Sequence, residues 1–245
     1  MTKARSPPLA KVFATTHWSV VLAAKHMEGT TAEAALERLC RVYWPPLYGY
    51  IRREGYDVET ARDLTQEFLS RFIHKEWLNH LQDQRGKFRS FLLTFLKHFL
   101  SDQRDLRRAQ KRGGGKALIS LDQMAAEEGA WAEPADHLTP EQVFERRWAQ
   151  TLMERAVDRL RAEYAERGKS AMYELLKDIQ PGERGELTYA DVAARLGTSE
   201  QAVKNAVHRL RRRYAQFLRD EIAQTVTEPW EVDEELQHLM TIFAR

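Results

Sequence analysis

The sequence has very little cysteine: Cys40 is the single one in 245 residues. One thiol excludes an internal disulfide and a cysteine-rich zinc site, because both need several cysteines in the same chain. Cys40 lies between Leu39 and Val42, so we expect a small buried hydrophobic side chain. The eight histidines are scattered without ligand spacing, and no nucleophile or carboxylate pair stands out. These absences argue against an enzyme, and we expect neither a metal nor a cofactor.

Long apolar runs are also absent. None approaches the roughly 18 residues that indicate a membrane-spanning helix. The opening residues, MTKARSPPLAKVF, lack the apolar core and the cleavage site of a signal peptide. Hydrophobic residues make up 43% and charged residues 30%, which is ordinary for a soluble protein of one or two domains. We therefore expect a cytoplasmic protein with no membrane association.

No segment alternates β-branched and polar residues over any length, so we expect no sheet. The sequence predicts an all-α fold of two helical domains joined by an acidic linker, the second ending in a helix-turn-helix. The expected segments are a flexible N-terminus over 1–15, a first domain over 16–112, a linker over 113–139, a second domain over 140–219 and an acidic C-terminal extension over 220–245.

Apolar spacing places the helices within these segments. The expected helices cover residues 16–27, 30–43, 47–51, 57–73, 86–112, 140–164 and 169–179, with two more inside 188–214. Between the second and third, Trp44-Pro45-Pro46 should kink or break the chain, because proline has no amide hydrogen and disfavours helical geometry in the residue before it.

The net charge is only +2, but the charges are strongly segregated along the chain. Arg104–Lys116 holds six basic residues and one acid, and Gln201–Arg219 holds six basic residues and no acid. Two acidic stretches, Asp122–Glu145 and Asp220–Arg245, hold seven acids each. Gly113-Gly114-Gly115-Lys116 is followed by alanine and not by Ser or Thr, so it indicates the start of a linker and not a phosphate-binding loop. The distribution predicts two separate basic surfaces.

The stretch from Thr188 to Tyr214 predicts two short helices around a tight turn. Thr188 and Asp191 have the spacing of a capping box, which would start the first helix. Gly197 suits the left-handed conformation that ends a helix, and Thr198 or Ser199 can cap the next one.

The second of these helices has two different faces. An apolar stripe of Val203, Val207, Leu210 and Tyr214 should pack on the first helix. The other face carries polar groups suited to base edges near the helix start and cations suited to phosphates further along. We expect it to bind duplex DNA through Ser199, Gln201, Lys204, Asn205, His208, Arg209, Arg211, Arg212 and Arg213. The alternative is a solvated basic helix in an all-α bundle.

The helix expected over residues 86–112 combines aromatic rings with cations. Phe88, Phe91, Phe95 and Phe99 form one stripe, which by itself is typical of a core. Cations near aromatic rings also suit single-stranded nucleic acid, whose phosphates and bases both need partners. The candidate contacts to a separated strand are Lys97, His98, Arg104, Arg107, Arg108, Lys111 and Arg112.

Taken in order, these pieces resemble a bacterial RNA polymerase sigma factor of the small, two-domain, extracytoplasmic-function-like kind. Asp63-Leu64-Thr65-Gln66-Glu67-Phe68 is similar to the helix by which such factors bind the polymerase clamp. Phe88-Arg89-Ser90-Phe91-Leu92, with Lys97-His98, is similar to the helix that opens the minus-ten promoter element. Thr188–Arg213 is similar to the helix-turn-helix that reads the minus-thirty-five element.

The resemblance implies partners and roles. It implies core RNA polymerase and promoter DNA as partners, an anti-sigma or other regulatory protein as a further one, and promoter recognition and DNA melting as the activity. The residues it implies for polymerase binding are Asp63, Gln66, Glu67, Phe68 and Arg71. Two alternatives remain at this point: a stand-alone helix-turn-helix regulator of duplex DNA, and a helical enzyme acting on nucleic acid.

Overall fold

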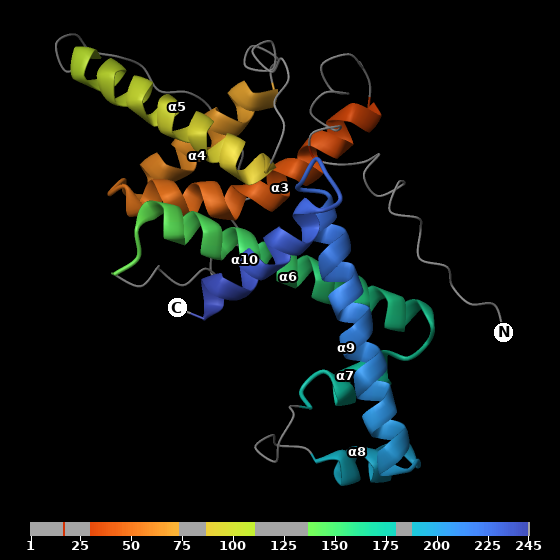
Figure 1. The fold of residues 1–245 in the computed structure, drawn as a ribbon. Coiled ribbons are helices and arrows are strands. Elements are labelled where there is room, and N and C mark those ends of the chain that lie inside the picture. The colour runs from red at the N-terminus through yellow and green to blue at the C-terminus, as the bar shows by residue number, and fades with distance from the viewer. Residues whose placement is uncertain (1–16, 18–29, 74–86, 111–136, 180–187, 245) are drawn as a thin grey trace. The chain divides into compact units, whose positions relative to one another are not determined.

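The structure is a computed structural model that describes residues 17, 30–73, 87–110, 137–179 and 188–244. Within these ranges the chain forms eight helices and no strand, which confirms the predicted all-α fold class (Figure 1). Apart from His17, the helix expected over 16–27 lies outside the described residues, as do most of the linker and the loop at 181–185.

The chain forms two compact units. The first comprises Met1–Thr151 together with Ala223–Arg245, and the second comprises Leu152–Ile222. The second unit is thus an insertion between two segments of the first. This division differs from the boundaries expected from the sequence, because the start of the helix after the linker and the acidic C-terminal segment both belong to the first unit.

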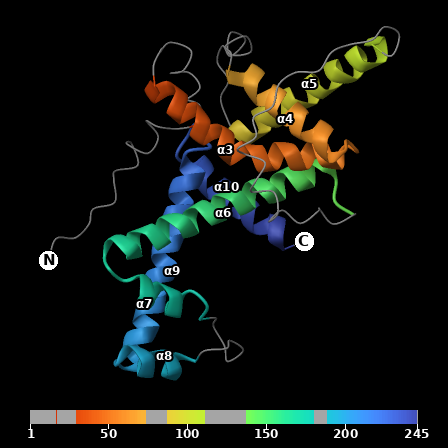
Figure 2. The same cartoon turned by 180° about the vertical axis from the view of Figure 1, so that it is seen from behind.

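The first unit is built from helices α3 (Thr30–Arg53), α4 (Val58–Ile73), α5 (Phe88–Gln110) and α10 (Glu231–Phe243), with the first part of α6 (Pro140–Glu166). Helices α4 and α5 lie on one side of α3, and α10 and the start of α6 lie on the other (Figures 1 and 2). Aromatic side chains fill the core between them, and the fully buried ones are Tyr43, Phe68, Phe72, Phe88, Phe99, Phe144 and Trp148.

Helix α3 continues through Pro45 and Pro46, so of the kink or break that the sequence predicts, the break is wrong. Proline inside a helix costs about 3 kcal/mol through a lost hydrogen bond and a steric clash. Tyr43 and Leu47, on either side of the prolines, are both 0% exposed. Burying such side chains stabilises the fold by about 1.5–3 kcal/mol each, which is enough to offset the cost. The helix ends where expected, before Gly55 with its φ of 93°.

The second unit contains the rest of α6 and helices α7 (Ser170–Leu176), α8 (Tyr189–Leu196) and α9 (Glu200–Ala223, up to Ile222). The predicted apolar stripe of α9 is confirmed for Val203, Val207 and Leu210, which are all buried. Val192 and Ala193 of α8 are buried as well. The packing therefore leaves the opposite face of α9 toward solvent.

Candidate functional site

The turn between α8 and α9 is fixed by local hydrogen bonds. The predicted capping box is present: the Asp191 amide donates to Thr188 Oγ1 at 3.2 Å, and the Thr188 amide donates to an Asp191 carboxylate oxygen at 2.9 Å. The Thr188 hydroxyl also donates to the Asp191 carboxylate at 2.6 Å, and this bond, together with the one from the Thr188 amide, holds the pKa of Asp191 below its usual range. Gly197 adopts a left-handed φ of 61°, and Ser199 Oγ accepts from the Ala202 amide at 3.2 Å. The direction in which α9 begins is therefore set by this turn.

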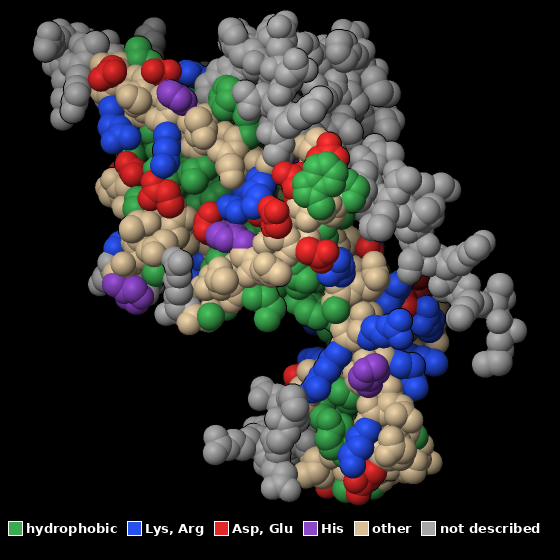
Figure 3. Space-filling view, in the orientation of Figure 1, with side chains coloured by type: hydrophobic (Ala, Val, Ile, Leu, Met, Phe, Trp, Pro, Cys, Tyr) green, Lys and Arg blue, Asp and Glu red, His purple; other side chains and the backbone are tan. Residues whose placement is uncertain are grey.

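The exposed face of α9 carries most of the residues that the sequence predicts for duplex DNA. Gln201, Lys204, Asn205, His208 and Arg212 recur at helical spacing on one face, and Arg209 and Arg211, also exposed, lie at its two edges. Gln201 Nε2 lies 3.3 Å from Asn205 Oδ1, which aligns two amide side chains near the helix start. Lys, Arg and a histidine gather on this surface of the second unit (Figure 3). The arrangement is a basic ridge with amide groups at one end.

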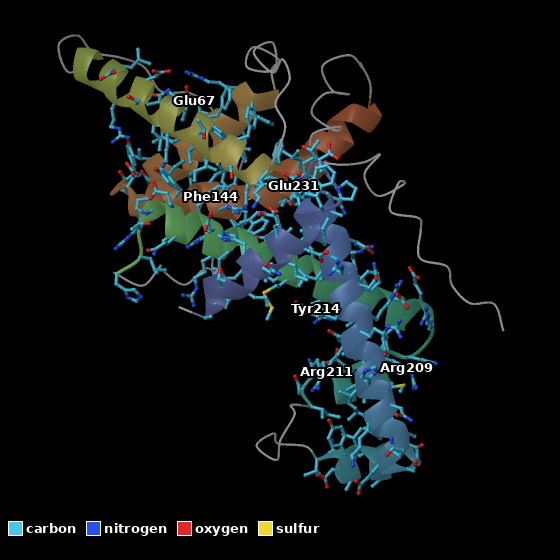
Figure 4. The ribbon with its side chains drawn as sticks, in the orientation of Figure 1. Glu67, Phe144, Arg209, Arg211, Tyr214 and Glu231 are labelled. Atoms are coloured by element: carbon cyan, nitrogen blue, oxygen red, sulfur yellow. The ribbon has the colours of Figure 1, made fainter. Side chains whose placement is uncertain are left out.

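Two of the predicted DNA contacts bind parts of the second unit outside α9 or near its end. Arg211 Nη2 donates to the Ile179 carbonyl at 2.8 Å. Arg213 Nε lies 2.6 Å from a Glu163 carboxylate oxygen, and its guanidinium lies 4.2 Å from the Phe217 ring centre. Figure 4 shows Arg209 and Arg211 on different sides of α9. Arg211 and Arg213 therefore tie α9 to neighbouring parts of the second unit.

Glu221 is a structural residue that the sequence analysis assigned to the acidic extension. It is 3% exposed and accepts hydrogen bonds from Arg155 at 2.7 Å and Arg159 at 2.8 Å. Both arginines lie on α6, more than 60 positions away in sequence. No local pattern signals a pairing over that separation.

Two of the α5 cations predicted to hold a separated DNA strand, Lys97 and Arg104, are paired with acids. Lys97 Nζ lies 2.7 Å from Glu141 of α6, and Arg104 Nη1 lies 3.4 Å from Glu54, in the turn after α3. The Lys97 hydrogen bond holds the pKa of Glu141 below its usual range. His98 is exposed. Four further predicted contacts are not placed: Arg107 and Arg108 lie on α5 with undescribed side chains, and Lys111 and Arg112 lie outside the described residues.

Arg89 lies on the same side of α5 and was not among the predicted contacts. It is 7% exposed, its guanidinium binds Glu235 at 2.8 and 3.1 Å, and it also donates to Glu145. Burial acts to lower the pKa of Arg89, but the two carboxylates outweigh burial and raise it. One flank of α5 thus carries three cations, each paired with acids from outside α5.

Helix α4 presents only part of the predicted polymerase-binding set. Asp63 is exposed, and Gln66, Glu67 and Arg71 are half-buried. Arg71 pairs with Glu67, which also accepts from Gln103 of α5 at 3.0 Å. Phe68, by contrast, is 0% exposed and packs against Phe99 with ring centres 5.6 Å apart. Phe68 is therefore a core residue here and presents no surface to a partner, contrary to its predicted role.

The described residues offer neither a metal site nor a membrane span. They contain no group of three or more His, Cys, Asp or Glu side chains placed to hold a metal ion. None of the helices in the described ranges is both long and apolar enough to cross a membrane. Cys40 is buried, as expected, and burial is the main reason that the pKa of its thiol rises to about 12.

Comparison with known protein families identifies the family of this chain. The family described as "ECF sigma factor" matches residues 50–220, which is more than half of the chain. The matched range includes α4, α5 and the α8–α9 pair. Neither the curated proteins nor the solved structures include a significant match.

Proposed function

The chain belongs to the ECF sigma factor family and acts in transcription initiation, and from this premise we propose a division of labour between its two units. The first unit binds core RNA polymerase and holds the separated strand of the minus-ten element. The second unit reads the duplex minus-thirty-five element. The polymerase supplies the chemistry, and the sigma factor works in the cytoplasm beside it.

The observation that carries the proposal is the exposed face of α9 behind a rigid capped turn. Gln201 and Asn205, at the helix start, have the amide groups that pair with adenine edges in the major groove. Arg209 and Arg212, further along, suit phosphates. Each good base contact contributes about 1–3 kcal/mol of discrimination, whereas phosphate contacts contribute salt-dependent affinity without sequence preference.

For the first unit we propose that α5 holds the separated strand. Unstacking a base costs a few kcal/mol, so melting needs a surface that binds the single strand better than the duplex. Lys97, His98 and Arg104 supply polar and cationic groups there, and the strand phosphates would compete with Glu141 and Glu54 for the two cations. The undescribed cations from Arg107 to Arg112 would extend the same track.

For polymerase binding we propose the outer side of α4. Asp63 and Gln66 are accessible, and Glu67 and Arg71 form a half-buried pair beside them. Phe68 would support this helix from inside by packing on α5. The family match covers this helix, which supports the assignment.

In-vitro transcription with purified core polymerase tests the proposal. We expect promoter-specific transcripts only when the chain is added. Substituting Asp63→Ala with Gln66→Ala should weaken core binding at least about ten-fold, as expected for central interface residues, while duplex binding by the chain alone stays unchanged. Duplex binding by the chain with no promoter-specific transcript when core polymerase is present would favour a stand-alone regulator instead.

A further inference from the structure

The C-terminal segment Ala223–Phe243 is an integral part of the first unit. Val226, Val232 and Leu239 are at most 5% exposed, so one side of the segment is packed into the core. The Gln224 carbonyl also accepts a hydrogen bond from the His17 amide at 2.7 Å. The acidic extension is therefore not simply a solvated helix.

This segment meets the first turn of α5 at two points. The Phe88 amide, one of the amides that a helix N-terminus leaves without an internal partner, donates to the Thr225 carbonyl at 3.0 Å. Glu235, which is 0% exposed, binds the Arg89 guanidinium with both carboxylate oxygens and lies 2.7 Å from Lys87 Nζ. A backbone bond and a charge cluster thus act on the same turn.

The start of α5 needs such help, because its own sequence gives none. Helices α4, α6, α8 and α9 each carry an acid in the first turn, but α5 has none there. It has Lys87 and Arg89 instead, and cations are unfavourable beside the positive end of a helix dipole. The negative charge that stabilises this helix start comes from Glu235, 146 positions further along the chain.

The charge cluster is closed on its other side by α6. Glu145 accepts a hydrogen bond from Arg89 Nη1, and its other oxygen lies 3.0 Å from His238 Nε2 of α10. The Arg89 guanidinium lies 5.0 Å from the buried Trp148 ring. Arg89 is thus held from three directions, and removing one charge from such a buried group leaves the others uncompensated.

We propose that Ala223–Phe243 is a built-in clamp that caps α5 in place of a local capping residue, with Glu235 as the positioning residue. The inference rests on the proposed function, in which α5 is the helix that holds the separated strand. It means that the last helix of the chain sets the first turn of the strand-holding helix, so promoter opening depends on it. Binding of core polymerase through α4 does not depend on this helix.

The test compares the full-length chain with Glu235→Gln, which keeps the shape of the side chain and removes its charge. Glu234→Gln is the matched control, because Glu234 is adjacent, 65% exposed and only 3.9 Å from Lys87. Hydrogen exchange is measured over residues 87–93, and core binding and promoter opening are measured with holoenzyme. Glu235→Gln should speed exchange in this turn about ten-fold or more and reduce promoter opening, with core binding kept, because the buried cations lose their partner. Glu234→Gln should behave like the wild type.

Two results would overturn the clamp. One is a Glu235→Gln variant with unchanged exchange at 87–93 and unchanged promoter opening. The other is loss of protection across the whole first unit together with loss of core binding, which would make Glu235 a general stability residue. If the variant does not fold, the wild type decides: the amides of α10 and the first turn of α5 should open together. Much faster exchange in α10 than in α5 would contradict the clamp. Failure of the wild type to open promoters would instead count against the proposed function.

Discussion

Individual cations on α5 and α9 differ in their protein partners. These partners determine whether each side chain is available to bind DNA. Arg212 is exposed on the ridge of α9, whereas Arg211 donates to the Ile179 carbonyl. Lys97 is paired with Glu141, but both side chains remain nearly half exposed. Exposed pairs of this kind contribute little to stability, so Lys97 can change partners at low cost.

Adjacent arginines of α9 should therefore respond differently to the same substitution. Arg212→Gln should weaken duplex DNA binding and reduce the slope of log affinity against log salt by about 1, with stability unchanged. Arg211→Gln should lower the free energy of unfolding by about 1 kcal/mol, because a hydrogen bond to a backbone carbonyl is lost. Fluorescence anisotropy over a salt series and urea denaturation measure the two effects. The reverse pattern would show that the roles are misassigned.

Neutralising Glu141 should strengthen binding of a separated strand. Glu141→Gln leaves Lys97 without its carboxylate partner, so phosphate no longer competes with it, and affinity of the holoenzyme for fork-junction DNA should rise about two- to five-fold. The control is Lys97→Gln, which should lower that affinity. An unchanged affinity in both variants would place the strand elsewhere.

For these side chains, the sequence predicts the charge but not the partner. The sequence shows that Lys97, Arg104 and Arg89 are cations on an aromatic helix. It does not show that Glu141, Glu54 and Glu235 pair with them, since the partners come from two other helices and the turn after α3. The sequence also does not show whether Phe68 faces a partner or the core, because a phenylalanine at this position fits either pattern.

Among the elements, α8 depends most on local chemistry. Its eight residues are too few for a stable isolated helix, so the backbone groups at its ends need hydrogen-bond partners. Thr188 and Asp191 satisfy amides at one end, and Gly197 allows the turn at the other. Such signals are short-range, and this is why they could be read from the sequence.

Removing the Thr188 hydroxyl should destabilise the second unit. Thr188→Ala should lower its free energy of unfolding by about 0.5–2 kcal/mol, the usual cost of losing a cap. Thr188→Ser keeps the hydroxyl and should stay close to wild type. Urea denaturation followed by circular dichroism measures the difference, and equal losses in both variants would mean that the hydroxyl does not act as a cap.

The stabilisation from the capping box should also depend on pH. The pKa of Asp191 is lowered by its hydrogen bonds with Thr188, so the folded state favours the charged carboxylate. The contribution should be fully present above the unfolded pKa of about 3.9 and should fade as pH falls through the lower folded pKa. Asp191→Asn should remove this pH dependence in stability curves measured between pH 2 and pH 6, roughly the range around that pKa. A wild-type curve with the same acid limb as the variant would contradict the assignment.

Helix α3 shows the opposite case, in which distant contacts override a local signal. Pro45 and Pro46 predict an interruption from local rules, but the side chains around them are buried by α4, α5 and α6 in the aromatic core. A local pattern cannot register that gain. The same limit applies to α5, whose missing acid is supplied from α10.

In the whole molecule, the C-terminal segment Ala223–Arg245 belongs to the same compact unit as the N-terminal helices. Three motifs in order were enough to indicate the family, and the match over residues 50–220 confirms it. The place of the acidic segment was not predictable, because its composition is that of a solvated tail. Its position follows from Glu235 and the buried apolar residues around it, which only the folded chain brings next to Arg89.

Permanganate footprinting of a cognate promoter tests the proposed division of labour most directly, because it detects unpaired thymines. With core polymerase and the full chain, thymines of the minus-ten element should become reactive. The double variant Asp63→Ala, Gln66→Ala should abolish that reactivity. The double variant Arg209→Gln, Arg212→Gln should reduce it, and a higher protein concentration should restore it. Reactive thymines in the absence of the chain, or none in its presence, would contradict the account.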